Sequence, residues 1–216
     1  MSITLCILSV AAMGFFFDRY FHHRKDYKDN KVALIYKASD TLVPVLLCLY
    51  ALLRRAPAGV YWLLFTGIFL CMAADVVIGI RFEAGTLVFL VAQLCLIAYY
   101  FTLAPFHWVS ILLFFGILIL EALILKPSFS YPLNRLICCG AYALAMAFMV
   151  SMALLLPFSV YLSGTILLAV GAVLFLISDT MLAQNTFGKP VQWRDRLLMA
   201  FYYSAVYLMA VSTFYL

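Results

Sequence analysis

Long runs of apolar residues, separated by short polar or proline-containing breaks, extend over the whole chain. A helix needs about 20 apolar residues to cross the hydrocarbon core of a bilayer, and the runs have about that length. Basic residues follow the first run rather than precede it, which favours a retained helix over a signal peptide. The pattern therefore predicts eight membrane-spanning helices, at roughly 2–20, 32–53, 60–80, 84–103, 107–125, 134–155, 158–182 and 195–215.

Composition leads to the same fold class. Of the 216 residues, 68% are hydrophobic and 11% are charged, whereas soluble domains have about 45–50% apolar and about 25% charged residues. This excludes a soluble enzyme, a nucleic-acid-binding module and a secreted disulfide scaffold. The six cysteines lie inside apolar runs without a C-x-x-C motif, so we expect no metal or redox site. Residues 1–216 are expected to form a single all-α domain of a polytopic integral membrane protein.

The basic residues are unevenly distributed between the two sides of the predicted bundle. Arg54 and Arg55 lie in the second loop, whereas the other twelve of the 14 Lys and Arg residues lie in or near the first, third, fifth and seventh loops. Cytoplasmic loops carry the excess of Lys and Arg in membrane proteins. We therefore expect both termini on the non-cytoplasmic side of a bacterial inner membrane or an ER-type membrane.

Two of the spans share a pattern that indicates an internal repeat. Gly67 precedes Asp75 by eight residues in the third span, and Gly171 precedes Asp179 by eight residues in the seventh. Because an even number of helices separates the two copies, this predicts a parallel four-plus-four repeat, with chance similarity between two apolar helices as the alternative. The halves would be about residues 1–105 and 106–216.

Several polar side chains lie inside the predicted spans, where ionisable groups are costly and indicate a functional site. Asp75 and Asp179 have no cation within four residues in the sequence, so a purely structural role explains them least well. By the predicted topology these polar residues share the cytoplasmic half of the membrane, with Gln93 near its middle. They would together form a polar chamber open to the cytoplasmic side. The further candidates are Lys37, Asp40, Gln93, Glu121, Asn134, Ser178, Tyr202 and Tyr203.

Most of these residues also have a structural explanation. Lys37 could extend to the membrane surface, and Asp40, three residues later on the same helix face, could be its local ion-pair partner. Glu121 could pair with Lys126 or mark the end of its helix. Tyr202 and Tyr203 could be ordinary packing aromatics.

Two carboxyl groups buried close together favour one protonated and one ionised member, the arrangement used for acid–base hydrolysis of glycosides and related ethers. The same pair could instead carry protons or cations in a small transporter. Residue spacing does not separate these two functions.

Three stretches of the sequence form a recognisable pattern: Ala74-Asp75 followed by Phe82, Gly85 and Phe89, then Gly171-Ala172, Phe175 and Ser178-Asp179-Thr180, then Tyr202-Tyr203. These stretches resemble the lysoplasmalogenase (YhhN-like) family of integral membrane proteins, which is similar in size and thought to have eight spans. The resemblance extends in helix count and order over most of the chain. This sequence departs from the family pattern in having Ala74 in place of Gly, Gln93 in place of His, Val206 in place of Gln and Ala38 in place of Pro.

The resemblance implies hydrolysis of the vinyl ether bond of lysoplasmalogens, giving a fatty aldehyde and glycerophospho-ethanolamine or glycerophospho-choline. Asp75 and Asp179 would be the catalytic acid and base in either order, and Lys37 would hold the lipid phosphate. No cofactor or metal is implied, and the partners are a lysophospholipid substrate and membrane lipid. The departures leave an active hydrolase and a divergent, inactive member as alternatives. The remaining substrate-binding candidates are Gln93, Ser178, Tyr202, Tyr203, Asp40, Glu121 and Asn134.

A small transporter with the same carboxyl groups as coupling sites is the second reading of the sequence, and a non-catalytic helical scaffold is the third. A transporter needs a polar pathway that reaches both membrane faces, whereas few polar residues lie in the outer half of these spans. The sequence therefore favours the hydrolase.

Overall fold

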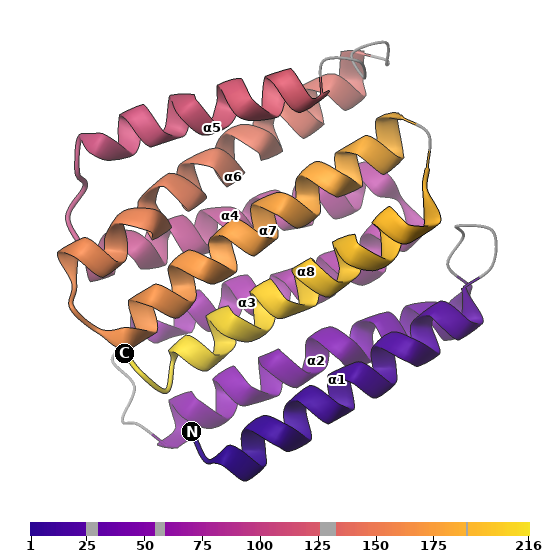
Figure 1. Ribbon diagram of the computed structural model, residues 1–216, viewed down its shortest axis with the longest axis horizontal. Coiled ribbons are helices and arrows are strands. Elements are labelled where there is room, and N and C mark those ends of the chain that lie inside the picture. The colour runs from indigo at the N-terminus through magenta and orange to yellow at the C-terminus, as the bar shows by residue number, and fades with distance from the viewer. Residues whose placement is uncertain (25–29, 55–58, 126–132, 189) are drawn as a thin grey trace.

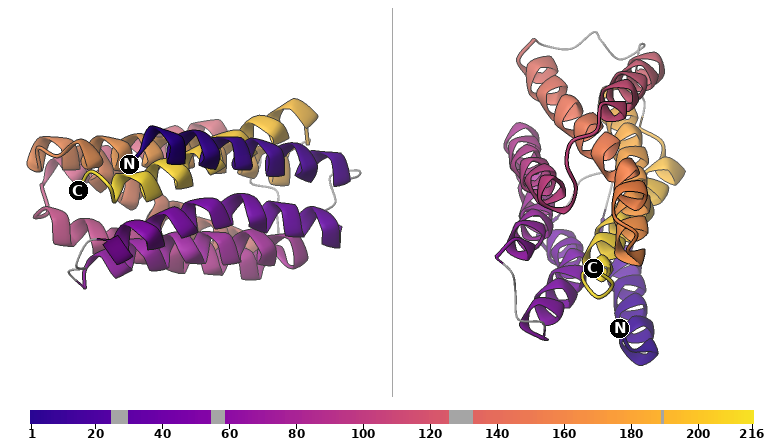
Figure 2. Two further views of the ribbon diagram at one scale, coloured as in Figure 1. Left: turned by 90° about the horizontal axis from the view of Figure 1, so that it is seen from below. Right: turned by 90° about the vertical axis from the view of Figure 1, so that its left-hand side faces the viewer.

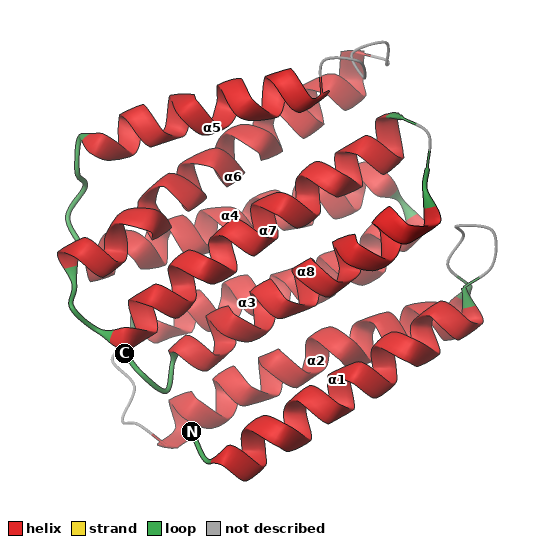
Figure 3. Cartoon of the chain, viewed as in Figure 1, coloured by secondary structure: helices red, strands yellow, loops and turns green. Residues whose placement is uncertain are grey.

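The protein is a bundle of eight α-helices, and the residues that the structure describes contain no strand (Figures 1 and 3). The computed structural model describes residues 1–24, 30–54, 59–125, 133–188 and 190–216, with the backbone alone at 133–136. This confirms the predicted all-α fold. The helices are α1 (Ile3–His23), α2 (Lys31–Arg54), α3 (Tyr61–Ile80), α4 (Phe82–Leu103), α5 (Val109–Leu125), α6 (Leu133–Ser159), α7 (Ser163–Phe187) and α8 (Gln192–Ser212).

Six helices, α1 to α4, α6 and α7, are long and apolar enough to cross a membrane. The other two fall short for different reasons. Helix α5 is apolar but has only 17 residues, about 25 Å at 1.5 Å per residue. Helix α8 has the length but begins with the polar sequence Gln-Trp-Arg-Asp-Arg. The chain is a multi-pass membrane protein.

The predicted boundary between the sixth and seventh spans was wrong by several residues. The predicted break between residues 155 and 158, which contains Pro157, lies inside α6: this helix continues to Ser159, and α7 begins only at Ser163. Membrane helices tolerate proline because neighbouring groups satisfy the freed backbone carbonyl. At its other end α7 continues to Phe187, beyond the predicted limit at 182, because its polar last turns face a cavity rather than lipid.

The helices lie side by side with nearly parallel axes, in two layers (Figures 1 and 2). Helices α2, α3 and α4 form one layer, and α1, α7 and α8 lie over them. The closest pairs are α3 with α4 and α7 with α8, while α2 packs on α8 and α4 on α6 across the bundle. Helix α5 lies at one edge, against α6, and Ser110 is its one buried residue. The core between the layers is the place where polar groups are shielded from lipid.

Two glycines permit close contact within the main helix pairs. A Cβ atom at Gly85 would lie 2.5 Å from Ile78, which is one turn beyond Asp75 on α3. A Cβ atom at Gly171 would lie 3.0 Å from the Ala205 carbonyl oxygen of α8. Small residues let the backbones of membrane helices approach closely. Gly85 therefore fixes α4 against the part of α3 that carries Asp75.

Replacing Gly85 with alanine tests this contact. We expect Gly85→Ala to lower the free energy of unfolding by about 1–3 kcal/mol, because the added methyl group overlaps the α3 backbone. Thermal unfolding of purified protein in one detergent measures the effect. The control is Gly116→Ala on α5, where an added Cβ meets nothing within 4 Å. Equal transitions for the two variants would contradict the proposed contact.

Candidate active site

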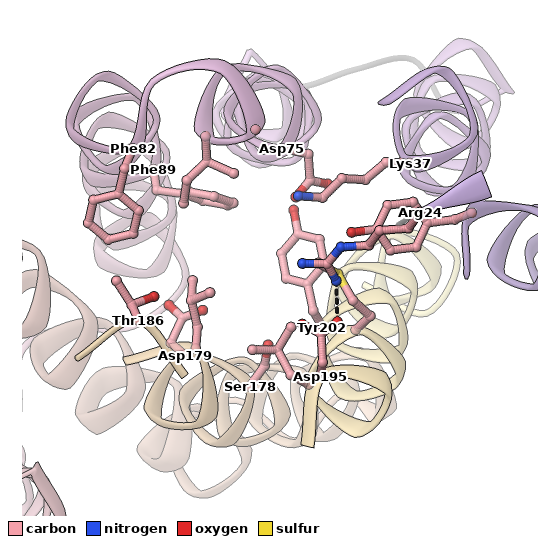
Figure 4. A pocket seen from close by; sticks show the side chains of 16 residues that line it. Arg24, Lys37, Asp75, Phe82, Phe89, Ser178, Asp179, Thr186, Asp195 and Tyr202 are labelled. Carbon is pink, nitrogen blue, oxygen red and sulfur yellow. Dashed lines mark hydrogen bonds and ion pairs between the residues drawn. The ribbon is translucent and has the colours of Figure 1, made fainter. Parts of the chain in front are cut away.

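A cavity of about 390 Å³ lies between the two layers, near the end of the bundle where α1 joins α2, α3 joins α4 and α7 joins α8. We call it the central cavity. Six helices or their ends contribute to its wall (Figure 4). Its lining residues are Tyr20, Arg24, Lys37, Asp75, Ile78, Gly79, Phe82, Phe89, Ser178, Asp179, Leu182, Thr186, Asp195, Leu198, Met199 and Tyr202.

The two carboxyl groups with the strongest sequence signal face this cavity from opposite layers. Asp75 lies on α3 and Asp179 on α7, and Figure 4 shows them across the cavity from one another. Asp75 is almost fully buried, and Asp179 is half-buried. Ser178 also lines the cavity, directly beside Asp179. The structure thus brings together residues that are 104 positions apart.

A tyrosine of α6 holds the Asp179 side chain in place. The Tyr142 hydroxyl donates a hydrogen bond to its carboxylate, and the fully buried Gln93 of α4 acts on the same hydroxyl. Sequence reasoning missed Tyr142, because nothing in its local sequence distinguishes it among 14 tyrosines. Gln93 itself does not line the central cavity and lies buried near this tyrosine.

Tyr202 lies next to Asp75, and neighbouring groups hold its ring and its hydroxyl group in place. Its hydroxyl donates to the Cys71 carbonyl oxygen at 3.3 Å and faces the Asp75 carboxyl group. Its ring packs edge-to-face on Phe89 at 5.9 Å and on Phe175 at 5.3 Å between centroids. Such aromatic contacts fix ring orientation in a packed core.

Two cations lie on the Asp75 side of the cavity. Lys37 is almost fully buried and points toward Asp75 (Figure 4), so it does not extend to the membrane surface. Arg24 forms an ion pair with Asp195, which joins the end of α1 to the start of α8. Arg24 and Asp195 were missed because they lie beyond or at the end of a predicted span, where charge is expected. The result is a cavity with both cations on one side, beside Asp75 and Asp195, and an opposite side without lysine or arginine among its described residues.

A smaller apolar slot of about 90 Å³ continues from the side of the central cavity that holds Asp179. It lies between α4, α5, α6 and α7 and shares Phe82, Phe89 and Asp179 with the cavity. Glu121 lines this slot, and its Oε2 atom has no hydrogen-bond partner among the described residues. The remaining slot residues are mostly apolar, including Leu125, Ala143, Met146, Leu182 and Phe187.

Three predicted site residues lie elsewhere or are not described. Asp40 and Tyr203 line a separate groove between α1, α2 and α8 rather than the central cavity. Both carboxylate oxygens of Asp40 are buried and make no hydrogen bond to a described residue, so no hydrogen bond joins it to Lys37. Asn134 lies in the first turn of α6, where its side chain is outside the described part of the structure. A metal ion has no candidate site, because no three His, Cys, Asp or Glu side chains group together among the described residues.

A comparison with protein families decides the classification. The model of the YhhN family matches residues 35–213. The chain belongs to the YhhN family. The match confirms the resemblance found in the sequence, and it includes all central-cavity residues of this YhhN chain except Tyr20 and Arg24. Searches of curated proteins and of solved structures found no match.

The hydrogen bond from Tyr142 should stabilise the fold through Asp179. We expect Tyr142→Phe to lower the free energy of unfolding by about 1–2 kcal/mol, because a buried carboxyl group loses its donor. The control Tyr161→Phe removes a hydroxyl from a side chain that is 92% exposed and should leave the thermal transition unchanged. A Tyr142→Phe transition equal to that of the control would rule out a stabilising role for this bond.

Proposed function

We propose that this YhhN protein is a membrane-embedded hydrolase that cleaves the vinyl ether bond of lysoplasmalogens. The observation that carries the proposal is the order of features along the cavity: a basic side, two facing carboxyl groups and an apolar slot. A lysoplasmalogen has a phosphate headgroup, a vinyl ether and an alkyl chain in the same order. The YhhN family match supports the same class of reaction.

The proposed substrate position follows from this order. Lys37 and Arg24 bind the phosphate, because cations pair strongly with phosphate in sites shielded from water. The alkyl chain begins in the apolar slot and continues past α5 into the lipid. Helix α5 has a largely exposed apolar surface, as expected of a lipid-facing wall. The vinyl ether then lies between Asp75 and Asp179.

The proposed reaction consumes one water molecule and leaves no net change in protons. An aspartic acid transfers its proton to the β-carbon of the vinyl ether, and the π electrons form the new C–H bond. The α-carbon becomes an oxocarbenium ion, which the other carboxylate stabilises while it takes a proton from the attacking water. The hemiacetal then breaks its bond to the glycerol oxygen, which takes the proton that the second carboxyl group removed from water and leaves as an alcohol. The hemiacetal hydroxyl returns a proton to the first carboxylate, and a fatty aldehyde remains.

The positions of Asp75 and Asp179 support one assignment of the acid and the base. The β-carbon is the chain-side carbon of the vinyl ether, and Asp179 is the carboxyl group shared between cavity and slot. Asp179 is therefore proposed as the acid. Asp75 faces Lys37, whose ammonium group stabilises negative charge there, so Asp75 is proposed as the carboxylate that supports the cation and activates water.

The location of the central cavity at one end of the bundle favours a hydrolase over the transporter considered above. The cavity lining comes from one end of the bundle, at the junctions that follow α1, α3 and α7. The loops at this end carry most of the basic residues, which supports a cytoplasmic opening. A hydrolase needs access from one side, whereas a transporter needs access from both.

Aldehyde release from an alkenyl lysophospholipid tests the proposal. We expect the wild-type protein in detergent micelles to release aldehyde, and Asp75→Asn and Asp179→Asn each to reduce the rate by about 10²–10⁴-fold, because each removes an acid–base group. The matched control is Asp18→Asn on α1, a carboxyl group that does not line the cavity. All variants must retain the wild-type thermal transition.

Two outcomes would overturn this assignment. Aldehyde release at wild-type rate by either aspartate variant would remove that residue from the reaction. Folded wild-type protein that releases no aldehyde from ethanolamine or choline substrates would remove the hydrolase, and ion-coupled transport would become the leading function.

The role of Lys37 is tested with a substrate pair. We expect Lys37→Gln to raise KM by about 10-fold for the alkenyl lysophospholipid, because a charged hydrogen bond to phosphate is lost. The same variant should not change KM for the alkenylglycerol, which lacks phosphate. The control is Lys31→Gln at the exposed start of α2. An equal KM change for both substrates would show that Lys37 does not bind phosphate.

A further inference from the structure

A second cavity of about 360 Å³ lies outside the proposed active site, between α1, α2 and α8. We call it the α1/α8 groove. Its walls include Met13 and Phe17 of α1 and Tyr203 and Leu208 of α8. It shares no lining residue with the central cavity, because Tyr202 faces the cavity while Tyr203 faces the groove.

Helices α1 and α8 are joined near both ends of the groove, and Phe17 and Tyr203 make an edge-to-face ring contact at 6.3 Å between these ends. Near one end, Ser9 and Tyr207 are joined by a hydrogen bond of 2.9 Å between their hydroxyl groups. At the other end, Arg24 pairs with Asp195. Between them, a Cβ atom at Gly14 would meet nothing within 4 Å, so open space lies beside α1. The groove is therefore open toward the lipid.

Asp40 is the one carboxyl group among the described residues that line this groove. Its side chain is fully buried, and neither carboxylate oxygen has a hydrogen-bond partner among the described residues. The charged neighbour that acts on it is Asp75, which has the same sign. A buried carboxyl group without a partner is strongly unfavourable in an apolar environment. The site therefore lacks a positively charged hydrogen-bond donor.

We infer that the α1/α8 groove binds a long-chain primary amine dissolved in the membrane, with its ammonium group on Asp40 and its alkyl chain along the apolar walls. An ammonium group supplies up to three donors and the opposite charge, whereas an alcohol supplies one donor and no charge. The carboxyl group is covered in the ligand-free protein, so the amine must displace a neighbouring side chain to reach it.

The position of Asp40 along α2 disfavours a phospholipid headgroup at this site. Asp40 is nine residues from the start of α2, about 13 Å along the helix axis at 1.5 Å per residue. It therefore lies more than two turns inside a helix that is long and apolar enough to cross a membrane. A phosphate carried next to the amine would have to leave water entirely. The ligand class is therefore an amine borne directly on an alkyl chain.

Binding of dodecylamine to the full chain in lipid nanodiscs tests the inference, with occupancy measured by native mass spectrometry. We expect a saturable adduct with dodecylamine that dodecanol at the same concentration does not form. Asp40→Asn should weaken binding on the order of 30-fold or more, because one partner of a buried charge pair is lost. This variant should keep or raise the thermal transition, since it removes a buried carboxyl group that has no hydrogen-bond partner.

A second variant fills the groove without altering Asp40. Gly14→Leu should abolish the adduct, because its side chain occupies the open space beside α1. The matched control is Gly116→Leu, at another helical glycine with nothing within 4 Å of an added Cβ, and it should bind as the wild type does. No saturable adduct, equal binding of dodecanol, or wild-type binding by Asp40→Asn or Gly14→Leu would each overturn the inference.

Discussion

The structure depends on the need to keep carboxyl groups away from lipid. Asp75, Asp179 and Asp40 each lie within a helix that is long and apolar enough to cross a membrane. Such a helix can carry an acidic group only if other helices enclose it or provide polar partners. The two-layer arrangement meets this need, because each aspartate lines a space between helices while many large apolar side chains are exposed on the outside. Close packing at Gly85 and Gly171 then holds together the helix pair on each side of that space.

The enclosed space has a polarity gradient across its width. Lys37 and the Arg24–Asp195 pair lie at one side, and the apolar slot leaves from the other. A ligand with a charged end and an apolar end can therefore fit in one direction only. Orientation comes from the walls before any chemistry occurs, which is how an active site lowers the entropic part of a barrier. The aromatic contacts of Tyr202 fix its ring beside Asp75, and the hydrogen bond from Tyr142 holds Asp179 within these walls.

The fold was largely predictable from the sequence, because apolar run length directly reflects bilayer thickness. The helix ends were less predictable, since Pro157 remains helical and the polar end of α7 faces a cavity instead of water. Asp75 and Asp179 were predictable from their isolation in apolar runs. Tyr142, Arg24 and Asp195 were not, because their importance comes from contacts between distant helices. Asp40 was expected with the others, but its helix face turns toward a different space. The predicted repeat of two halves stays a prediction.

Helix α8 has a consequence for how the two spaces behave. Its consecutive tyrosines face opposite sides, so the helix acts as a partition between the central cavity and the groove. A rotation of α8 about its own axis would widen one space and narrow the other. Occupants of the two spaces would then be thermodynamically linked, and each would change the affinity of the other by the same factor. A molecule that enters the α1/α8 groove from the lipid would in this way change ligand binding in the central cavity without entering it.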